Sequence, residues 1–220
     1  LRKGDTLIVD KTGTLTEGRP SFEKAIAASG FDEAEVLRLG ASLDQGSEHP
    51  LAAAIVTAAH DRKLALDKPE GFDSASGIGV RGQVAGKAIG LGNATLMLQL
   101  GVDLAPLASQ AEALRQQGAS VMHLAVDGKL AGLLAVSDPV KATTAEALAS
   151  LRAADIKVIM ATGDGLSTAK AVAHRLGIDE VHGEFKPADK LALVEQLQSQ
   201  GRVVAMAGDG INDAPALARA

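Results

Sequence analysis

The sequence predicts an α/β fold, a doubly wound parallel sheet interrupted by an inserted α+β domain with an antiparallel sheet. From residue 138 onward, helical segments alternate regularly with short apolar strands, which is typical of a doubly wound parallel sheet. An isolated apolar strand near Thr6–Asp10 would complete that sheet. The block between them has Gly-punctuated β segments and the hairpin signal Asp127-Gly128. We therefore predict a discontinuous domain of residues 1–17 and 137–220, and an inserted domain of residues 18–136.

Composition limits the class of protein. The 220 residues are 46% hydrophobic, which suffices for the cores of two small domains. Net charge is −5, and no basic block is interleaved with aromatic residues, so nucleic acid is not an expected partner. Cysteine is absent, which excludes disulfides, thiolate metal sites and cysteine nucleophiles and fits a reducing compartment. No apolar stretch reaches the roughly 18–20 residues that span a bilayer, and we expect this part of the polypeptide to be soluble and to belong to a longer chain.

The elements of the middle block follow from caps and turn residues. Asp32 caps a predicted helix that runs through Leu39, and His49-Pro50 opens an amphipathic helix that ends near Leu64. Further along, we predict β segments near 72–76, 79–84 and 87–91, helices near 94–100 and 104–118, and strands near 120–126 and 130–136.

The last third of the chain contains the alternating helices and strands of the predicted parallel sheet. We predict a helix near 141–154, a strand at 157–161, helices at 166–176 and 188–200, a strand at 203–207 and a helix from residue 212.

Three strands of the predicted parallel sheet end in polar clusters. They are Asp10, then Thr162-Gly163-Asp164, then Gly208-Asp209-Gly210-Ile211-Asn212-Asp213. Each cluster alone is as well explained by a turn with a helix cap. In one parallel sheet, however, the carboxyl ends of the strands meet at a single crevice. The agreement of three clusters therefore favours a catalytic site.

Asp10 has the surroundings of a phosphate-accepting nucleophile. It follows a buried strand and precedes Lys11-Thr12-Gly13-Thr14, which suits a carboxylate that attacks a phosphoryl group and is held as an acyl phosphate. A carboxylate approaching a polyphosphate requires Mg²⁺, which prefers oxygen ligands. Asp10 and Asp209 are the expected Mg²⁺ ligands, and Asp213 is a further candidate.

Other residues suit the transferring phosphoryl group. Thr162 can donate its hydroxyl and Gly163 its amide, near a helix N-terminus that favours anions. Lys190 is interpreted as a phosphate-neutralising group, although a solvated surface lysine is the usual case. Thr12 stands where a second carboxylate would act as general acid and base, so we expect a long-lived intermediate.

The middle block carries two candidate nucleotide contacts. The string Gly77-Ile78-Gly79-Val80-Arg81-Gly82 is no dinucleotide fingerprint, because a β segment follows it instead of a helix. Its glycines fit either a hairpin or close approach of the backbone to a nucleotide. Glu48 and His49 fit either hydrogen bonds to adenine or a helix start at which His49 is a cap.

The three strand-end motifs, in this order, resemble the phosphorylation domain of P-type ATPases, members of the haloacid dehalogenase superfamily. The intervening block is similar to the nucleotide-binding domain of the heavy-metal-transporting branch, through Ser47-Glu48-His49-Pro50, the glycine string and Gly92-Asn93. Within that branch it looks most like the copper(I) exporters. One departure is Gly165, where many members have Asn.

The resemblance implies roles for individual residues. It implies that ATP phosphorylates Asp10 and that Mg²⁺ is held by Asp10, the Thr12 carbonyl and Asp209. It further implies phosphoryl contacts from Thr162 and Lys190 with Asp164 nearby, and a returning hinge at Asp138-Pro139-Val140-Lys141. The implied ATP pocket comprises Glu48, His49, Gly77, Gly79 and Asn93.

The expected function is that of the ATP-binding and phosphorylation unit of a cation-transporting P-type ATPase, which exports a heavy-metal ion, Cu⁺. By resemblance it would work at the cytoplasmic face of a membrane, with an actuator domain and with membrane helices that carry the metal ion. Two alternatives remain: a free-standing phosphatase of the same superfamily, against which Thr12 argues, and a nucleotide-sensing module without chemistry. Phosphoryl transfer from ATP would distinguish the P-type ATPase from a nucleotide-sensing module.

Overall fold

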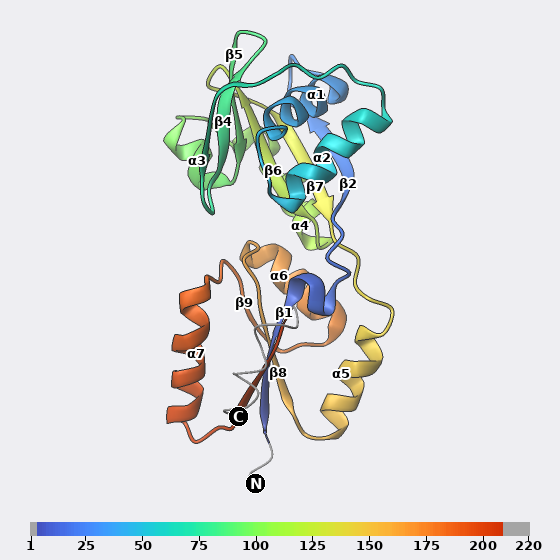
Figure 1. Ribbon diagram of the computed structural model, residues 1–220, viewed down its shortest axis with the longest axis vertical. Coiled ribbons are helices and arrows are strands. Elements are labelled where there is room, and N and C mark those ends of the chain that lie inside the picture. Colours follow the sequence, from blue (N-terminus) through green and yellow to red (C-terminus); the bar gives the residue numbers. More distant parts are fainter. Residues whose placement is uncertain (1–3, 209–220) are drawn as a thin grey trace. The chain divides into compact units, whose positions relative to one another are not determined.

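A computed structural model describes residues 4–208, which fall into two units (Figure 1). Unit 1 comprises the residues up to Arg19, residues 116–118 and the residues from Asp138 onward. Unit 2 comprises Pro20–Arg115 and Ala119–Ser137. Each unit has its own sheet and its own hydrophobic core, and each is described here by itself.

Unit 1 contains a parallel sheet with the strand order β10-β1-β8-β9. The strands are β1 (Thr6–Asp10), β8 (Lys157–Ala161), β9 (Glu180–His182) and β10 (Val204–Ala207). Asp10 pairs with Ala161, and Val9 pairs with Ala207, so β1, β8 and β10 end level with one another. The predicted parallel sheet, with the first strand of the chain inside it, is confirmed.

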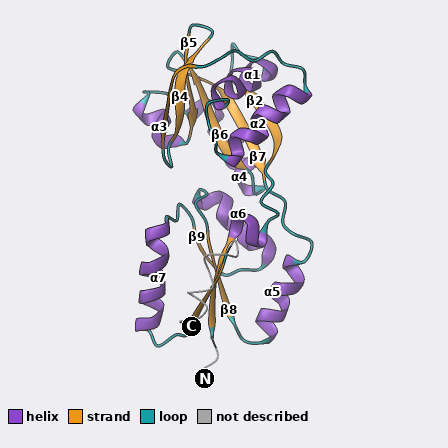
Figure 2. Cartoon of the chain, viewed as in Figure 1, coloured by secondary structure: helices purple, strands orange, loops and turns teal. Residues whose placement is uncertain are grey.

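Helices cover both faces of this sheet (Figure 2). One core is formed by α5 (Thr144–Ala153) and α6 (Leu166–Leu176) against Val9, Val158 and Met160. On the other face, α7 (Pro187–Ser199) packs Leu193 and Leu197 against Ile8 and Ile159. Successive strand residues alternate between the two faces, which explains why Ile8 and Val9 belong to different cores. The arrangement is doubly wound, as predicted.

Unit 2 contains an antiparallel sheet of six strands in the order β2-β7-β6-β5-β4-β3. Helices α1 (Glu33–Asp44) and α2 (Pro50–Asp61) pack on one face, and α3 (Ala94–Gln99) and α4 (Ala108–Gln116) pack on the other. The fold class predicted for the middle block is therefore confirmed. The strands are β2 (Ser21–Ala27), β3 (Glu70–Ala75), β4 (Gly79–Val84), β5 (Lys87–Gly92), β6 (Ser120–Val126) and β7 (Lys129–Ser137).

The local signals act as expected. The Asp32 carboxylate accepts a hydrogen bond from the Glu35 amide at 2.7 Å and so caps α1. Asp127 and Gly128 both have positive φ, 50° and 79°, which a two-residue hairpin turn between β6 and β7 requires.

Two strands were not predicted, and several element ends were wrong. β2 lies where only helices were expected, because a bulge between Phe22 and Lys24 breaks its alternation. β9 has three residues, too few to show a pattern. The predicted helix at 104–118 is a 3₁₀ turn, Ala105–Leu107, followed by α4, and α5 begins at Thr144 instead of residue 141. The predicted helix from residue 212 lies outside the described residues.

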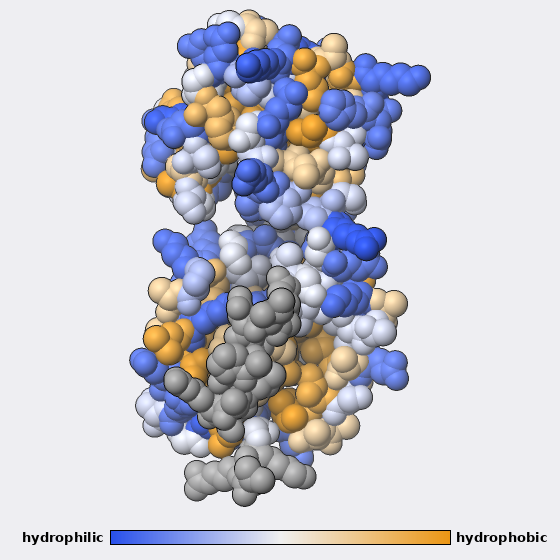
Figure 3. Space-filling model, viewed as in Figure 1, coloured by the Kyte–Doolittle hydropathy of each residue, from blue (hydrophilic) through white to orange (hydrophobic). Residues whose placement is uncertain are grey.

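Within residues 4–208, no helix combines the length and the apolar character needed to cross a bilayer. On the face shown in Figure 3, hydrophilic side chains are spread over the described parts of both units.

Candidate functional site

Asp10 and Thr162 lie at the same edge of the parallel sheet. Asp10 ends β1 and is level with Ala161, after which Thr162 leaves β8. Thr162 is buried, and its backbone is held on both sides, because its amide donates to the His182 carbonyl and its carbonyl accepts from the Phe185 amide. The first two predicted strand-end clusters therefore converge. Asp209 and Asp213, of the third, lie outside the described residues.

Lys190 contacts the carboxylate of Asp10. Its ammonium nitrogen lies 2.9 Å from both Oδ1 and Oδ2 of Asp10. The start of α7 fixes this position: Pro187 occupies the first turn, and the Asp189 carboxylate accepts a hydrogen bond from the Lys186 amide at 2.8 Å. Lys190 is therefore no freely solvated lysine, and its positive charge is directed at the candidate nucleophile.

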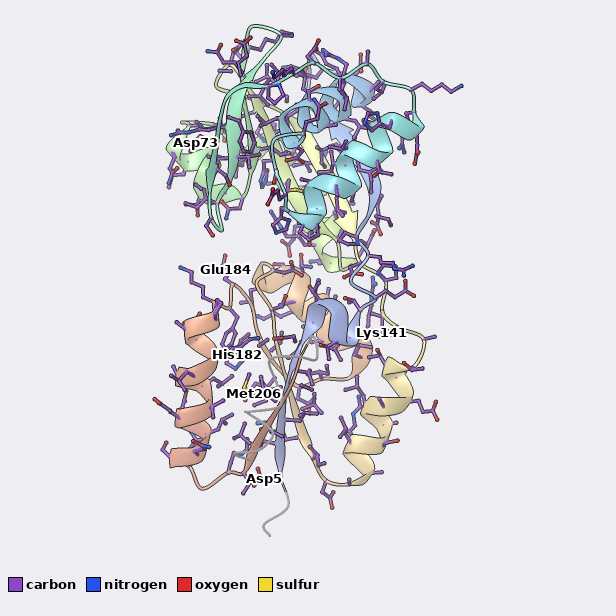
Figure 4. The ribbon with its side chains drawn as sticks, viewed as in Figure 1. Asp5, Asp73, Lys141, His182, Glu184 and Met206 are labelled. Atoms are coloured by element: carbon purple, nitrogen blue, oxygen red, sulfur yellow. The ribbon has the colours of Figure 1, made fainter. Side chains whose placement is uncertain are left out.

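A second ion pair joins the loop that follows Asp10 to the loop that follows Thr162. The ammonium of Lys11 contacts Oδ2 of Asp164, and the Lys11 side chain is only 5% exposed. The Asp164 amide donates to the Thr162 hydroxyl at 3.2 Å, which leaves the hydroxyl proton of Thr162 free for another acceptor. Gly163 lies between these two residues. His182 ends β9, and Glu184 lies in the loop from β9 to α7 (Figure 4); the Glu184 amide donates to the Asp164 carbonyl at 2.6 Å.

The loop after Asp10 is a wide turn, Lys11–Leu15, broken at its centre. Thr12 is extended, with φ −72° and ψ 124°, and Gly13 has a φ of 78°, a region that favours glycine. The Gly13 amide donates to Thr16 Oγ1 at 3.2 Å, and the Thr16 hydroxyl donates to Asp138 Oδ2 at 2.7 Å. Asp138 also accepts from the Arg19 amide at 3.0 Å. The shape of the loop is thus held by a carboxylate 122 positions beyond Thr16.

The donors in this region suit Mg²⁺. The Asp10 carboxylate and the Thr12 carbonyl are hard oxygen donors two residues apart, the ligand type that Mg²⁺ prefers. Thr12 is exposed, and the break at Gly13 separates it from the rest of the turn. Within residues 4–208, no three acidic, histidine or cysteine side chains gather into a metal-binding cluster. Any further acidic ligand would have to come from elsewhere, and the sequence predicts Asp209.

In unit 2, Gly77, Gly79 and Asn93 come together. The side-chain amide of Asn93 donates to the Gly77 carbonyl at 2.8 Å, and the Asn93 amide donates to the Ile78 carbonyl at 3.0 Å. A Cβ at Gly79 would lie 2.4 Å from the Leu91 carbonyl oxygen, so two strands pass too closely there for any side chain. By contrast, Gly77 has φ 74° and open space around it. Strand packing alone therefore accounts for Gly79, whereas Gly77 presents exposed backbone.

His49 and Glu48 lie in the turn between α1 and α2. His49 is exposed, and its Nδ1 accepts a hydrogen bond from the Leu51 amide at 3.1 Å, so His49 is the N-cap of α2. Capping and binding are compatible, because the accepting Nδ1 leaves Nε2 to carry a proton toward solvent. In the described part of the chain, no hydrogen bond or ion pair joins Glu48 or His49 to Gly77, Gly79 or Asn93.

Asp44 was not singled out from the sequence. It ends α1 directly before the turn that carries Glu48 and His49, and it is 5% exposed. Its Oδ2 has no hydrogen-bond partner among the described residues, and burial raises the pKa of Asp44 to about 7. A buried carboxyl with a perturbed pKa is typical of binding sites. The sequence signal that could have identified Asp44 is the presence of an acidic residue on the apolar face of a predicted helix.

A strand-end Asp with a lysine at its carboxylate, on a doubly wound sheet, is the site that the comparisons with known proteins have to explain. The family of haloacid dehalogenase-like hydrolases matches residues 5–220. The chain therefore belongs to the haloacid dehalogenase-like hydrolases.

Curated proteins similar to this chain include metal-transporting P-type ATPases. The chain is 51% identical over 99% of its length to the copper-transporting P-type ATPase of Rhizobium leguminosarum bv. viciae, and covers 26% of that protein. It is 48% identical over its whole length to the silver exporting P-type ATPase of Salmonella typhimurium, and covers 27% of it. The chain thus spans about a quarter of the length of these relatives.

Solved structures agree with this grouping. The catalytic domain of the CPx-ATPase CopB-B is 30% identical, with a TM-score of 0.70; the match covers 99% of this chain and 76% of that one. A zinc-transporting PIB-type ATPase in the E2.Pi state is 34% identical, with a TM-score of 0.68, and the match covers 99% of this chain and 35% of that one. The chain is thus similar to the catalytic part of heavy-metal P-type ATPases.

Proposed function

We propose that this chain is the ATP-binding and phosphorylation unit of a P-type ATPase, in which Asp10 accepts the terminal phosphoryl group of ATP. The observation that carries this proposal is the contact of Lys190 with both carboxylate oxygens of Asp10 at the carboxyl edge of the parallel sheet. Ligands of doubly wound sheets bind at this edge. A nucleophilic carboxylate, a cation directed at it and a neighbouring hydroxyl are the groups that phosphoryl transfer needs.

Each residue has a distinct part in the transfer. Asp10 Oδ attacks the γ-phosphorus, the bond from phosphorus to the bridging oxygen breaks, and ADP leaves with that oxygen. Lys190, already beside Asp10, shares its charge with the oxygens of the transferring group, and Thr162 donates its spare hydroxyl proton to one of them. Mg²⁺, held by Asp10, the Thr12 carbonyl and Asp209, would neutralise the phosphate charge when bound.

The aspartyl phosphate should be long-lived. Rapid hydrolysis needs a general base that activates water near the phosphorus. Two residues after Asp10, where such a base would stand, the chain has Thr12, and the carboxylate of Asp164, in the loop after β8, is paired with Lys11. A stable intermediate suits an enzyme that uses the phosphorylated state to drive another process. It argues against a free-standing phosphatase.

Nucleotide binding is assigned to unit 2. The exposed backbone at Gly77, whose carbonyl is bonded to Asn93, can approach a nucleotide closely, and the exposed ring of His49, with Nδ1 accepting from Leu51, can donate through Nε2. Gly79 and Glu48 complete the proposed contacts of unit 2, and Gly163 and Asp164, which belong to unit 1, are proposed to lie at the transferring phosphoryl group. The pocket and Asp10 belong to different units, so the transfer requires that the units be brought together through the segments near Arg19 and Asp138.

The proposed cargo is a soft monovalent metal ion, Cu⁺. The relatives above are named for copper and silver, and the zinc-transporting structure is less similar in sequence. The metal would be bound by membrane helices outside this chain. The chain itself would work at the cytoplasmic face of the membrane, together with an actuator domain.

Labelling with γ-³²P-ATP tests the proposal. In membranes that carry the full-length protein, Asp10→Asn should abolish acid-stable, hydroxylamine-sensitive labelling. The matched control is Asp61→Asn, at the exposed end of α2, which should label normally. Labelling that survived in Asp10→Asn would show that another residue is the nucleophile. A wild-type protein that bound ATP but never became labelled would instead support a nucleotide-sensing module.

A further inference from the structure

Glu184 has a backbone conformation that its place in the chain does not require. Its φ is 51°, in the left-handed region that residues other than glycine rarely adopt. It lies in the loop between β9 and α7. Within residues 4–208, the other non-glycine residues with positive φ lie just beyond a helix end or in a two-residue hairpin turn, where a left-handed residue is usual. They are Lys63, Ala85, Asp127 and Asp155.

The side chain of Glu184 does not account for this conformation. It is exposed, and its carboxylate makes no hydrogen bond or ion pair in the part of the chain that the structure describes. The backbone amide, by contrast, donates to the Asp164 carbonyl at 2.6 Å. Strained conformations persist where the surrounding structure holds them, and they cluster at functional sites. The reason for the strain therefore lies in the backbone contacts of the loop.

Residues 183–185, named the clasp here, hold the loop that follows β8 through two neighbouring amides. The Phe185 amide donates to the Thr162 carbonyl at 2.8 Å, next to the bond from the Glu184 amide to the Asp164 carbonyl. In an extended strand, successive amides point to opposite edges. A left-handed residue turns the chain so that two successive amides face the same side. The positive φ of Glu184 therefore allows both amides to reach one loop.

The clasp fits closely against the segment that carries Thr162. A Cβ on Gly183 would lie 2.7 Å from the Leu166 Cα and 3.1 Å from the Asp164 carbonyl oxygen, so the two backbones touch. On the strand side, the Thr162 amide donates to the His182 carbonyl at 3.0 Å. The hydroxyl of Thr162 accepts from the Asp164 amide at 3.2 Å. A shift of the clasp would therefore move both the backbone of Thr162 and the amide that orients its hydroxyl.

We propose that Glu184 is a positioning residue whose left-handed backbone, and not its carboxylate, holds the Thr162 hydroxyl in place for the transferring phosphoryl group. The inference rests on the proposed function, in which Thr162 donates to that group. Glu184 acts on the reaction only through Thr162. Its consequence is that residues that accept a positive φ can replace Glu184, whereas residues that resist it slow the phosphorylation of Asp10.

Substitutions at this position separate the backbone from the side chain. Glu184→Gly and Glu184→Asn remove the side chain or shorten it but accept a positive φ, whereas Glu184→Val has a β-branched side chain that resists it. Asp155→Val is the matched control. Asp155 has a φ of 58° in the same unit and precedes β8, so it lies at the end of that strand opposite to the clasp. Valine is therefore strained there too, but away from Thr162.

Rapid-quench labelling with γ-³²P-ATP, in membranes that carry the full-length protein, measures the effect. Glu184→Val should lower the maximal rate of labelling about 10- to 100-fold, the effect of displacing a reacting group slightly. The ATP concentration that gives half the maximal rate should not change, because the nucleotide contacts are assigned to unit 2. Glu184→Gly, Glu184→Asn and Asp155→Val should label at the wild-type rate. Equal rates in Glu184→Val and Asp155→Val, or slow labelling in Glu184→Gly and Glu184→Asn, would overturn the proposal.

A double variant tests whether Glu184 acts through Thr162. Thr162→Ala alone should slow labelling about 100-fold, since it removes a donor to the transferring group. Adding Glu184→Val should then slow labelling little further, because two residues that act through one group are not additive. The full effect of Glu184→Val in the Thr162→Ala background would show that Glu184 acts elsewhere.

Amide signals of the purified chain, recorded without ATP, keep this proposal distinct from the proposed function. Glu184→Val should shift the amides of residues 162–164 and speed hydrogen exchange at the Phe185 amide, whereas Asp155→Val should leave them at their wild-type values. Unshifted amides in Glu184→Val would refute the clasp even if Asp10 is labelled. Shifted amides, together with a full-length wild type that is never labelled, would refute the proposed function alone.

Discussion

The ammonium of Lys190 lies 2.9 Å from each carboxylate oxygen of Asp10, across 180 positions of sequence. One residue ends the first strand of the sheet and the other lies in the first turn of its last described helix. The doubly wound topology brings them together, because it gathers the carboxyl ends of strands and the amino ends of helices on one edge.

Replacing this lysine should slow chemistry more than binding. In Lys190→Gln we expect the rate of aspartyl-phosphate formation to fall about 100-fold, the usual effect of removing one group that stabilises developing charge. The affinity for ATP should change little, because the nucleotide contacts are assigned to unit 2. Rapid-quench labelling measures the rate, and Lys170→Gln, exposed on α6, is the control. An unchanged rate would remove Lys190 from the mechanism.

The pair of Lys11 and Asp164 should matter for stability. Asp164→Asn leaves the Lys11 ammonium, whose side chain is 5% exposed, without its carboxylate. We expect a loss of about 2 kcal/mol in the free energy of unfolding, less than a fully buried pair would cost because Asp164 is 22% exposed. Urea titrations of unit 1 signals measure it. The double variant Lys11→Met, Asp164→Asn should regain part of the loss, and the pair hypothesis fails if it is as unstable as the single variant.

The two glycines of the β3–β4 corner should respond differently to alanine. Gly79→Ala places a Cβ 2.4 Å from a backbone oxygen, at φ 145°, and should destabilise unit 2 by about 3 kcal/mol or more. Gly77→Ala meets no atom and pays only for its φ of 74°, about 1 kcal/mol. Denaturant unfolding followed by unit 2 amide signals compares them. Equal losses would mean that the contact at Gly79 relaxes freely.

The hydroxyl of Thr16 should control the loop that follows Asp10. Thr16→Val keeps the shape of the side chain but loses both the bond from the Gly13 amide and the bond to Asp138. We expect a loss of about 1–3 kcal/mol in stability and slower labelling of Asp10, because Thr12 and Gly13 are no longer fixed. Thr16→Ser, which keeps the hydroxyl, should restore both. Labelling of Thr16→Val at the wild-type rate would show that the loop is held without this hydroxyl.

Much of unit 1 could be predicted because its signals are local. Alternating helices and apolar strands define the doubly wound sheet, and polar residues at strand ends indicate where Asp10 and Thr162 meet. A phosphate-neutralising role for Lys190 could only be favoured, because a surface lysine has the same sequence pattern, and its contact with Asp10 was not predicted. The pairing of Lys11 with Asp164 was not predicted, since nothing in either motif shows which partner a buried lysine will find.

In unit 2 the limits are of another kind. β2 was missed because its bulge disrupts the period of two on which strand prediction depends. Two interpretations of His49 were left open, and the structure makes it the cap of α2 through Nδ1, which does not exclude a nucleotide contact through Nε2. Asp44 was not singled out, because the effect of burial on a polar side chain depends on elements distant in sequence.

Asp44 should make unit 2 less stable as the pH rises. Its carboxyl has a pKa of about 7 in the folded chain because burial disfavours its charged form, against about 4 when unfolded. The folded state therefore binds the proton more tightly. Its stabilising contribution is fully present below pH 4 and is lost as the pH rises through 7.

Asp44→Asn, which stays neutral, should be more stable than the wild type at pH 8 by about 2–4 kcal/mol and equally stable near pH 4. Thermal unfolding across this range measures the difference, with Asp61→Asn, exposed at the end of α2, expected to follow the wild type. If Asp44→Asn and the wild type kept parallel stability curves, the carboxyl of Asp44 would have to be charged in the folded chain, with a partner that compensates its burial.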